Sequence, residues 1–149
     1  MKGRLLLAIL CATAPTRLSA QSDLASVASA AAAAWTRHDF AGVVGGSRVE
    51  VRIPGVSASG PLPGDQAVAL LAAYVRDADE VEVSVITALA VSDQSGYAEL
   101  RRRFRRAGVG EPHEETLLLG FTRVRRTDGQ WVSHTPAGSV LPIGVAALI

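Results

Sequence analysis

Cysteine is almost absent from this chain: Cys11 is the single one among 149 residues. It lies in a segment that has the pattern of a removable export signal, so we expect the mature chain to contain none. A disulfide scaffold, a thiol nucleophile and a cysteine metal site are therefore excluded for the mature protein. A glycine-rich phosphate loop is also missing, because Gly42, Gly45 and Gly46 do not stand between a predicted strand and a predicted helix in the needed order.

The first twenty residues have the three parts of an export signal. They are a basic start, an apolar run of ten residues and a short end, at 1–4, 5–14 and 15–20. An apolar run of ten is shorter than the roughly 20 residues that span a bilayer, which favours a cleaved signal over an anchor. We expect cleavage near Ala20–Gln21 and a periplasmic or secreted protein. Lipid attachment at Cys11 is the alternative, which the bulky residues before it disfavour.

Net charge is small once the signal is gone. The mature 129 residues hold twelve basic and fourteen acidic side chains, a net charge of −2. This balance gives no reason to expect nucleic acid as a partner. The chain does contain a basic run, made of Arg101, Arg102, Arg103, Arg105 and Arg106. Acidic residues on the neighbouring predicted strands, namely Glu80, Glu82, Glu114 and Glu115, favour cross-strand ion pairs on a solvated face. Docking to an acidic partner or an anionic polymer is the alternative.

Hydrophobic spacing places helices before strands. Helices are predicted over 22–36, 40–44 and 65–77, and strands over 48–53, 80–91, 97–106, 115–126 and 130–135. We expect Ser22 to cap the first helix and Asp39 the second. The strand after the third helix is expected to turn one face inward, with Val81, Val83, Val85, Thr87, Leu89 and Val91.

Residues 136–149 contain no charged side chain. We expect an apolar tail that packs on the domain, plugs its interior or reaches a partner, and that is too short to span a membrane. The chain is thus divided into a signal at 1–20, one domain at 21–135 and a tail at 136–149. Helices followed by a run of strands predict an α+β fold, with helices on one face of a curved sheet.

Five short segments, taken in order, resemble the pattern of a known superfamily. They are Ala-Trp-Thr-Arg-His-Asp-Phe at 34–40, the strand 48–53, Gly-Asp-Gln-Ala at 64–67, Tyr97 at the start of a strand, and Asp-Gly-Gln-Trp-Val at 128–132. This order resembles the nuclear-transport-factor-2-like superfamily, which includes ketosteroid isomerases and polyketide cyclases. Within it, the chain is most similar to a domain family of unknown function in exported bacterial proteins.

The resemblance implies a curved antiparallel or mixed sheet and three N-terminal helices that together form a cone with a cavity. It implies no particular activity, because this fold carries enzymes, binders and interaction domains alike. Enzymes of the superfamily usually place carboxylates, tyrosines or histidines inside the cone, on strands. Catalysis there requires an acid or base with a shifted pKa. The predicted strands contain no aspartate, and we assign no catalytic residue.

A metal site is also not expected. Residues 113–115, His-Glu-Glu, are metal-ligand types, but neighbours on a strand point to opposite faces. His38 and Asp39 resemble a catalytic dyad, but Asp39 is better explained as a helix cap. We therefore predict no metal and no cofactor.

Arg102 is the most unusual position in the predicted strands. It shares strand parity with Leu100 and Phe104, so its guanidinium is expected inside the cone, where it would bind a carboxylate or a phosphate. The alternatives are that it lies at the sheet rim or that a bulge shifts the parity. The predicted ligand-binding residues are Arg102, Tyr97, Phe121 and Trp131.

These observations predict an exported, non-catalytic binding or interaction domain of the α+β cone class. Its ligand would be a small apolar or anionic molecule in the cone, or a protein partner on the sheet, including a second copy in a homodimer. The alternative is an isomerase, dehydratase or cyclase of the same superfamily. An inward Arg102 beside Tyr97, His134 or Glu115 would favour the enzyme, and a purely aliphatic interior would exclude it.

Overall fold

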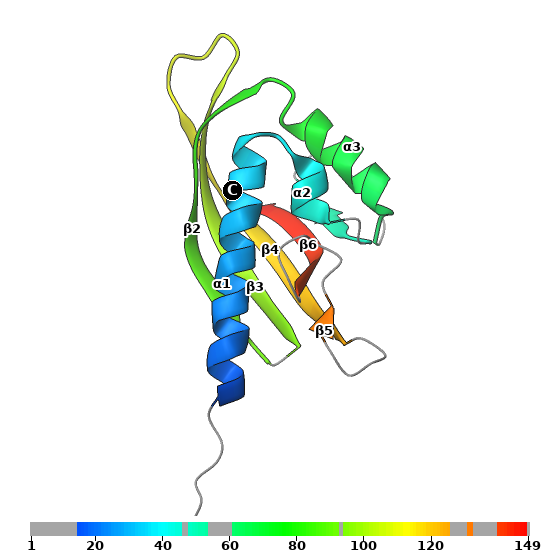
Figure 1. The fold of residues 1–149 in the computed structure, drawn as a ribbon. Helices are drawn as coiled ribbons and strands as arrows, with labels where there is room; N and C mark the ends of the chain where they lie inside the picture. The colour runs from blue at the N-terminus through cyan, green and yellow to red at the C-terminus, as the bar shows by residue number, and fades with distance from the viewer. Residues whose placement is uncertain are drawn as a thin grey trace, which may run out of the picture.

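The computed structural model describes residues 15–45, 48–53, 61–92, 94–125, 131–132 and 140–148, with side chains between 21 and 122 in these ranges. The elements follow as α1 (Pro15–Thr36), α2 (Phe40–Val44), β1 (Glu50–Arg52), α3 (Gly64–Tyr74), β2 (Ala78–Ala90), β3 (Ser95–Arg106), β4 (His113–Arg125), β5 (Trp131–Val132) and β6 (Val140–Leu148). Figure 1 shows these helices on one side of the sheet, with α1 lying along β2 and β3.

The sheet is mixed and mainly antiparallel. Its strands follow the order β1-β6-β4-β3-β2, and β5 pairs with β4 off this path. β1 runs parallel to β6, whereas the other neighbouring pairs are antiparallel. The predicted α+β class is therefore confirmed, and β2 is left as one edge of the sheet.

The segment expected to be a tail contains a central strand. β6 lies between β1 and β4, with Val145 opposite Val51 on one side and Leu119 on the other. The expectation that residues 136–149 stay outside the sheet was wrong for 140–148. The absence of charge has a simple physical reason, because a strand with neighbours on both sides is rich in apolar residues.

Helix α1 begins earlier than expected. It starts at Pro15, so Ser22 lies within the helix and is not its N-cap. Proline is favoured at the first helical position, where its missing N–H has no partner to lose. The predicted apolar face is confirmed, and its members are all buried: Leu24, Val27, Ala28, Ala31 and Trp35.

The junction between α1 and α2 forms as the sequence predicts. The Asp39 side chain accepts a hydrogen bond of 3.0 Å from the Gly42 backbone N–H, which caps α2. Gly45 ends the helix at φ 63°, a left-handed conformation that glycine adopts without strain. His38 also has a positive φ of 55°, and it turns the chain between the two helices.

The third helix and the first strand are shorter than predicted. α3 ends at Tyr74, and the residues it buries in the core are Ala67 and Leu71, whereas the neighbouring Ala72 is exposed. In and around β1 the alternation holds, because Val49, Val51 and Ile53 are buried.

Two bulges interrupt the alternation of β2. The register with β3 shifts between Glu80 and Glu82 and again between Val85 and Thr87. A bulge adds one residue to one strand, so it reverses which side chains face inward. The predicted inner face was correct for Val83 and Val85, which pack against the core, and wrong for the exposed Val81, Leu89 and Val91.

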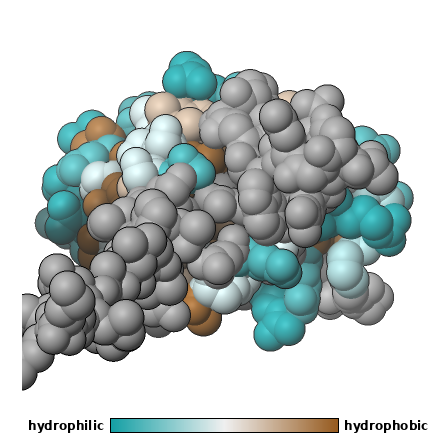
Figure 2. Space-filling model, turned by 60° about the horizontal axis from the view of Figure 1, so that its bottom comes forward, coloured by the Kyte–Doolittle hydropathy of each residue, from teal (hydrophilic) through white to brown (hydrophobic). Residues whose placement is uncertain are grey.

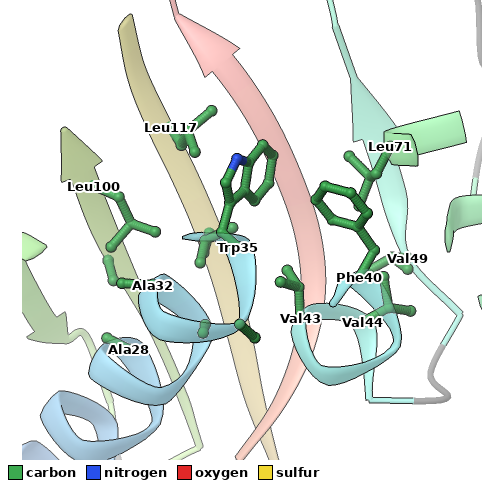
Figure 3. Close-up of a cluster of buried hydrophobic side chains, with 14 of the residues drawn as sticks. Ala28, Ala32, Trp35, Phe40, Val43, Val44, Val49, Leu71, Leu100 and Leu117 are labelled. Atoms are coloured by element: carbon green, nitrogen blue, oxygen red, sulfur yellow. The ribbon is translucent and has the colours of Figure 1, made fainter. Parts of the chain in front are cut away.

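The hydrophobic core lies between the helices and the inner face of the sheet. In Figure 3 the indole of Trp35 lies between Leu117 on one side and Phe40 and Leu71 on the other. The rings of Trp35 and Phe40 meet edge to face, with their centroids 5.2 Å apart. This packing joins α1, α2, α3 and β4 into one core.

Candidate functional site: a buried arginine cluster

Arg102 lies in the middle of β3 and points into the core. Its residue is 1% exposed, and its strand neighbours on the same face, Leu100 and Phe104, are buried too. The predicted inward orientation of Arg102, on the same face as Leu100 and Phe104, is therefore confirmed. The alternative, a position at the sheet rim, was wrong. A fully buried guanidinium must have partners, because an unpaired buried charge is very costly.

Two glutamates on the flanking strands supply those partners. Arg102 Nε donates to both carboxylate oxygens of Glu80 at 3.0 and 2.9 Å, and Nη2 donates to Glu80 Oε1 at 2.5 Å. On the other side, Nη1 donates to Glu115 Oε1 at 2.5 Å. Burial lowers the pKa of Arg102, but the hydrogen bonds and charges of the two carboxylates outweigh it and raise that pKa.

Two further side chains bind these glutamates from the helix layer. The Tyr74 hydroxyl, at the end of α3, donates to Glu115 Oε2 at 2.5 Å. His38 Nε2, after α1, lies 3.1 Å from Glu80 Oε1. Burial, then the hydrogen bond and charge of Glu115, raise the pKa of Tyr74 to about 12. These contacts thus connect the end of α3 and the junction between α1 and α2 to the strands β2, β3 and β4.

Aromatic rings surround the guanidinium carbon. It lies 3.9 Å from the centroid of Phe104, 5.6 Å from that of Tyr74 and 5.8 Å from that of Trp35. Cation–π attraction of this kind strengthens when water is excluded. We call His38, Tyr74, Glu80, Arg102 and Glu115 together the arginine cluster.

The arginine cluster carries an excess of negative charge. One guanidinium stands between two carboxylates, so while His38 is neutral the sum is −1. The donors of Arg102 that point to Glu80 and Glu115 are taken by the chain itself. In this arrangement Arg102 is not an open receptor for an anionic ligand.

Trp35 contributes an unusual polar atom beside the cluster. Its side chain is fully buried, and among the residues that the structure describes the indole Nε1 has no hydrogen-bond partner. A buried N–H without a partner costs about 1–3 kcal/mol, and such groups are rare in folded proteins. Among the buried side-chain atoms that the structure describes, Trp35 Nε1 is therefore the donor without an acceptor.

The four predicted ligand-binding residues do not come together. Tyr97 follows Gly96 and precedes the buried Ala98, so it lies on the opposite face of β3 from Arg102. Phe121 is buried, but six residues along β4 from Glu115, about 20 Å in an extended strand. The side chain of Trp131 lies outside the described residues, as does His134.

Sequence reasoning missed Glu80, Tyr74 and Trp35 as neighbours of Arg102. Glu80 was expected on the solvated face, and the bulge after it turns it inward instead. Glu115 was named beside an inward Arg102 only in the enzyme alternative. The signal that pointed to Trp35 and Tyr74 was weak, since large aromatics are ordinarily core residues.

Two other arginines of the basic run, Arg101 and Arg103, pair with glutamates on the outer face, as predicted. Arg103 Nη1 lies 3.7 Å from Glu82 Oε2, and Arg103 Nε lies 4.0 Å from Glu114 Oε2. Arg101 Nη2 lies 4.0 Å from Glu82 Oε1. These pairs are half-exposed and long, so each adds little stability.

Within the ranges that the structure describes, no group of three histidine, cysteine, aspartate or glutamate residues is arranged to hold a metal ion. The described helices also include none with the length and apolar character needed to cross a membrane.

A layer of helices on one face of a mixed sheet, with a charged cluster enclosed between them, defines a cone-shaped α+β domain. No family model matches the sequence, and no curated protein is similar to it at a significant level. Solved structures do match, and they show the fold: this chain has the nuclear-transport-factor-2-like fold.

Three of these structures cover most of the chain. A ketosteroid isomerase-like protein from Erwinia carotovora atroseptica is 12% identical, with a TM-score of 0.57 over 85% of this chain and 93% of its own. ActVI-ORFA from Streptomyces coelicolor is 16% identical, with a TM-score of 0.55 over 85% and 94%. An NTF-2 like protein of unknown function from Shewanella oneidensis is 12% identical, with a TM-score of 0.54 over 85% and 96%. At such identities the likeness extends to the fold and not to the activity.

Proposed function

We propose that this chain is an exported, non-catalytic domain that binds a small ligand between its helices and the inner face of its sheet. The observation that carries the proposal is the arginine cluster, a charged group enclosed in an apolar core and satisfied by its own members. Such a cluster orders the interior without offering a reactive group. Binding sites of small molecules are commonly built this way, mainly apolar with a few fixed polar groups.

The enzyme alternative has one observation in its favour. Arg102 faces inward beside Glu115, which is the arrangement expected of an isomerase, dehydratase or cyclase. A general base, however, must be able to reach the substrate proton, and a general acid needs a pKa near the working pH. Glu115 accepts from both Arg102 and Tyr74, and the pKa of Tyr74 is raised to about 12. Both features favour binding over catalysis.

Native mass spectrometry tests the binding proposal. The full chain is produced in a bacterial host, recovered under mild conditions and weighed before and after denaturation. We expect extra mass that denaturation removes. The matched control is Arg101→Met, on the outer face, which should keep the extra mass. A protein that carries no ligand, forms no dimer and brings no partner would overturn the proposal.

Export is part of the proposal and has its own test. Cleavage at Ala20–Gln21 would keep the contacts between Gln21 and β2. The Gln21 side-chain amide donates to Ala88 O at 2.5 Å and accepts from Ala90 N–H at 2.9 Å. We expect a periplasmic or secreted protein whose mass lacks residues 1–20. Recovery of the uncut chain from the cytoplasm alone would contradict export.

The outer face of the sheet suggests a second, compatible role as a homodimer interface. Leu89 lies between Ala88 and Ala90, which pack against the core, so Leu89 faces outward. Along β2 it is joined by Val81, Ile86 and Val91 as exposed apolar residues. In Figure 2 brown hydrophobic patches reach the surface on the left, the side where β2 lies in Figure 1. Exposed apolar residues grouped in this way are typical of contact surfaces.

Analytical ultracentrifugation tests the dimer. We expect a dimer for the wild type and a monomer for Leu89→Arg, with Arg105→Ala, an exposed change on the neighbouring strand, as the control. Monomers only, at high protein concentration, would exclude this role and leave the binding proposal untouched.

A further inference from the structure

The buried N–H of Trp35 has a consequence for what the interior binds. A fully buried indole donor without an acceptor loses its hydrogen bond to water on folding and gains nothing in return. A buried water or a ligand would each satisfy such a group. Trp35 stands where α1, α2, α3 and the sheet meet, so that partner would lie in the interior and not at the surface.

The charged groups near Trp35 restrict which molecule could accept a hydrogen bond from its indole. The nearest charged groups belong to the arginine cluster, whose guanidinium lies 5.8 Å from the Trp35 ring centroid. The cluster holds two carboxylates against one guanidinium, and the ion pairs direct that guanidinium toward the carboxylates. A second anion brought into this interior would add to the excess negative charge where water does not screen it.

The remaining surroundings are apolar. Buried aliphatic side chains of the sheet, among them Leu100 and Leu117, belong to the same core cluster as Trp35. A molecule enclosed there gains from burying apolar surface, and it needs one acceptor to satisfy the indole.

We propose that Trp35 Nε1 is the hydrogen-bond donor of a ligand subsite, and that the subsite takes an uncharged, mainly apolar molecule with one oxygen acceptor, not an anion. This inference rests on the proposed binding function and narrows it. It replaces the expectation of an apolar or anionic ligand on Arg102 by a neutral ligand on Trp35.

The test uses three six-membered-ring probes of similar size. Cyclohexanone offers a neutral oxygen acceptor, methylcyclohexane offers none, and cyclohexanecarboxylate offers an anion. The full chain, labelled with ¹⁵N-tryptophan, has two tryptophans and hence two indole N–H signals. Trp35→Phe removes one signal and so identifies that of Trp35.

We expect cyclohexanone to shift the Trp35 signal downfield in a saturable way. Methylcyclohexane should cause no downfield shift, and cyclohexanecarboxylate should not bind at pH 7. In Trp35→Phe the affinity for cyclohexanone should fall about three- to tenfold, the range of one neutral hydrogen bond, while that for methylcyclohexane should hold. The wild-type signal alone decides the matter should the variant fail to fold.

Three results would overturn the subsite. They are tighter binding of the carboxylate than of the ketone, an unchanged Trp35 signal at saturating ketone, and a signal whose only partner is a buried water that no probe displaces. Native mass spectrometry separates this failure from that of the proposed function. An anionic molecule retained by the protein would refute the subsite and support binding, whereas an empty protein would count against both.

Discussion

Replacing Arg102 by methionine isolates the energetic role of the arginine cluster. Methionine keeps much of the volume and removes the charge, which leaves Glu80 and Glu115 facing each other with their shared donor gone. Removing one partner from a buried ion pair costs about 3–5 kcal/mol. Because domains of this size are stable by about 5–15 kcal/mol, this single change should remove a large part of the total.

The assay is equilibrium unfolding in urea, followed by circular dichroism, with Arg101→Met as the matched control. Arg101 is the neighbouring residue on the outer face, and its ion pair with Glu82 spans 4.0 Å between half-exposed groups. Its loss should cost less than about 1 kcal/mol.

A triple variant separates the charge from the packing. Adding Glu80→Gln and Glu115→Gln to Arg102→Met neutralises the whole site, and stability should then recover in part, as it does when buried ion pairs become uncharged. A loss below about 1 kcal/mol for Arg102→Met, or no recovery of stability in the triple variant, would refute this account of the cluster.

Three further predictions concern single features. Tyr74→Phe loses the hydrogen bond to Glu115, so the free energy of unfolding should fall by about 1–2 kcal/mol, and the ultraviolet titration step near pH 12 should vanish. The fold raises the pKa of Tyr74 from 10.0 to about 12. The contribution of Tyr74 to stability is therefore complete below pH 10 and is lost between pH 10 and 12. Gly96→Ala would bring a methyl group within 2.6 Å of Leu24 Cδ2 and 2.8 Å of Leu89 O, so thermal unfolding should show a loss of about 1–3 kcal/mol, whereas Gly110→Ala, in open space, should change little. A chain that stops at residue 139 lacks β6 and should show no cooperative unfolding transition, and a folded monomer of that length would contradict the central position of the strand.

Local patterns predicted several features of the fold correctly. Asp39 and Gly45 mark the ends of α2 because capping chemistry depends on a few neighbouring residues. The inward position of Arg102 followed from simple alternation, since β3 keeps its register with β4 throughout. Features set by one segment alone are thus readable in the sequence.

Features set by pairing between distant segments were not predicted. The bulge after Glu80 has no signature in the sequence, yet it decides that Glu80 faces Arg102 and not the solvent. Residues 140–148 have the composition of a buried strand, but nothing local specifies that β1 and β4 are its partners. The candidate site depends on such pairings more than the helices do.

The position of β6 has a consequence for how the chain folds. β1 pairs along the sheet only with β6, and Gly144 follows its partner Glu50 by 94 residues. Closing so long a loop precedes any gain from the contact, which slows folding and delays it until residue 148 has been synthesised. A nascent chain would therefore keep this edge of its sheet incomplete until β6 has been synthesised.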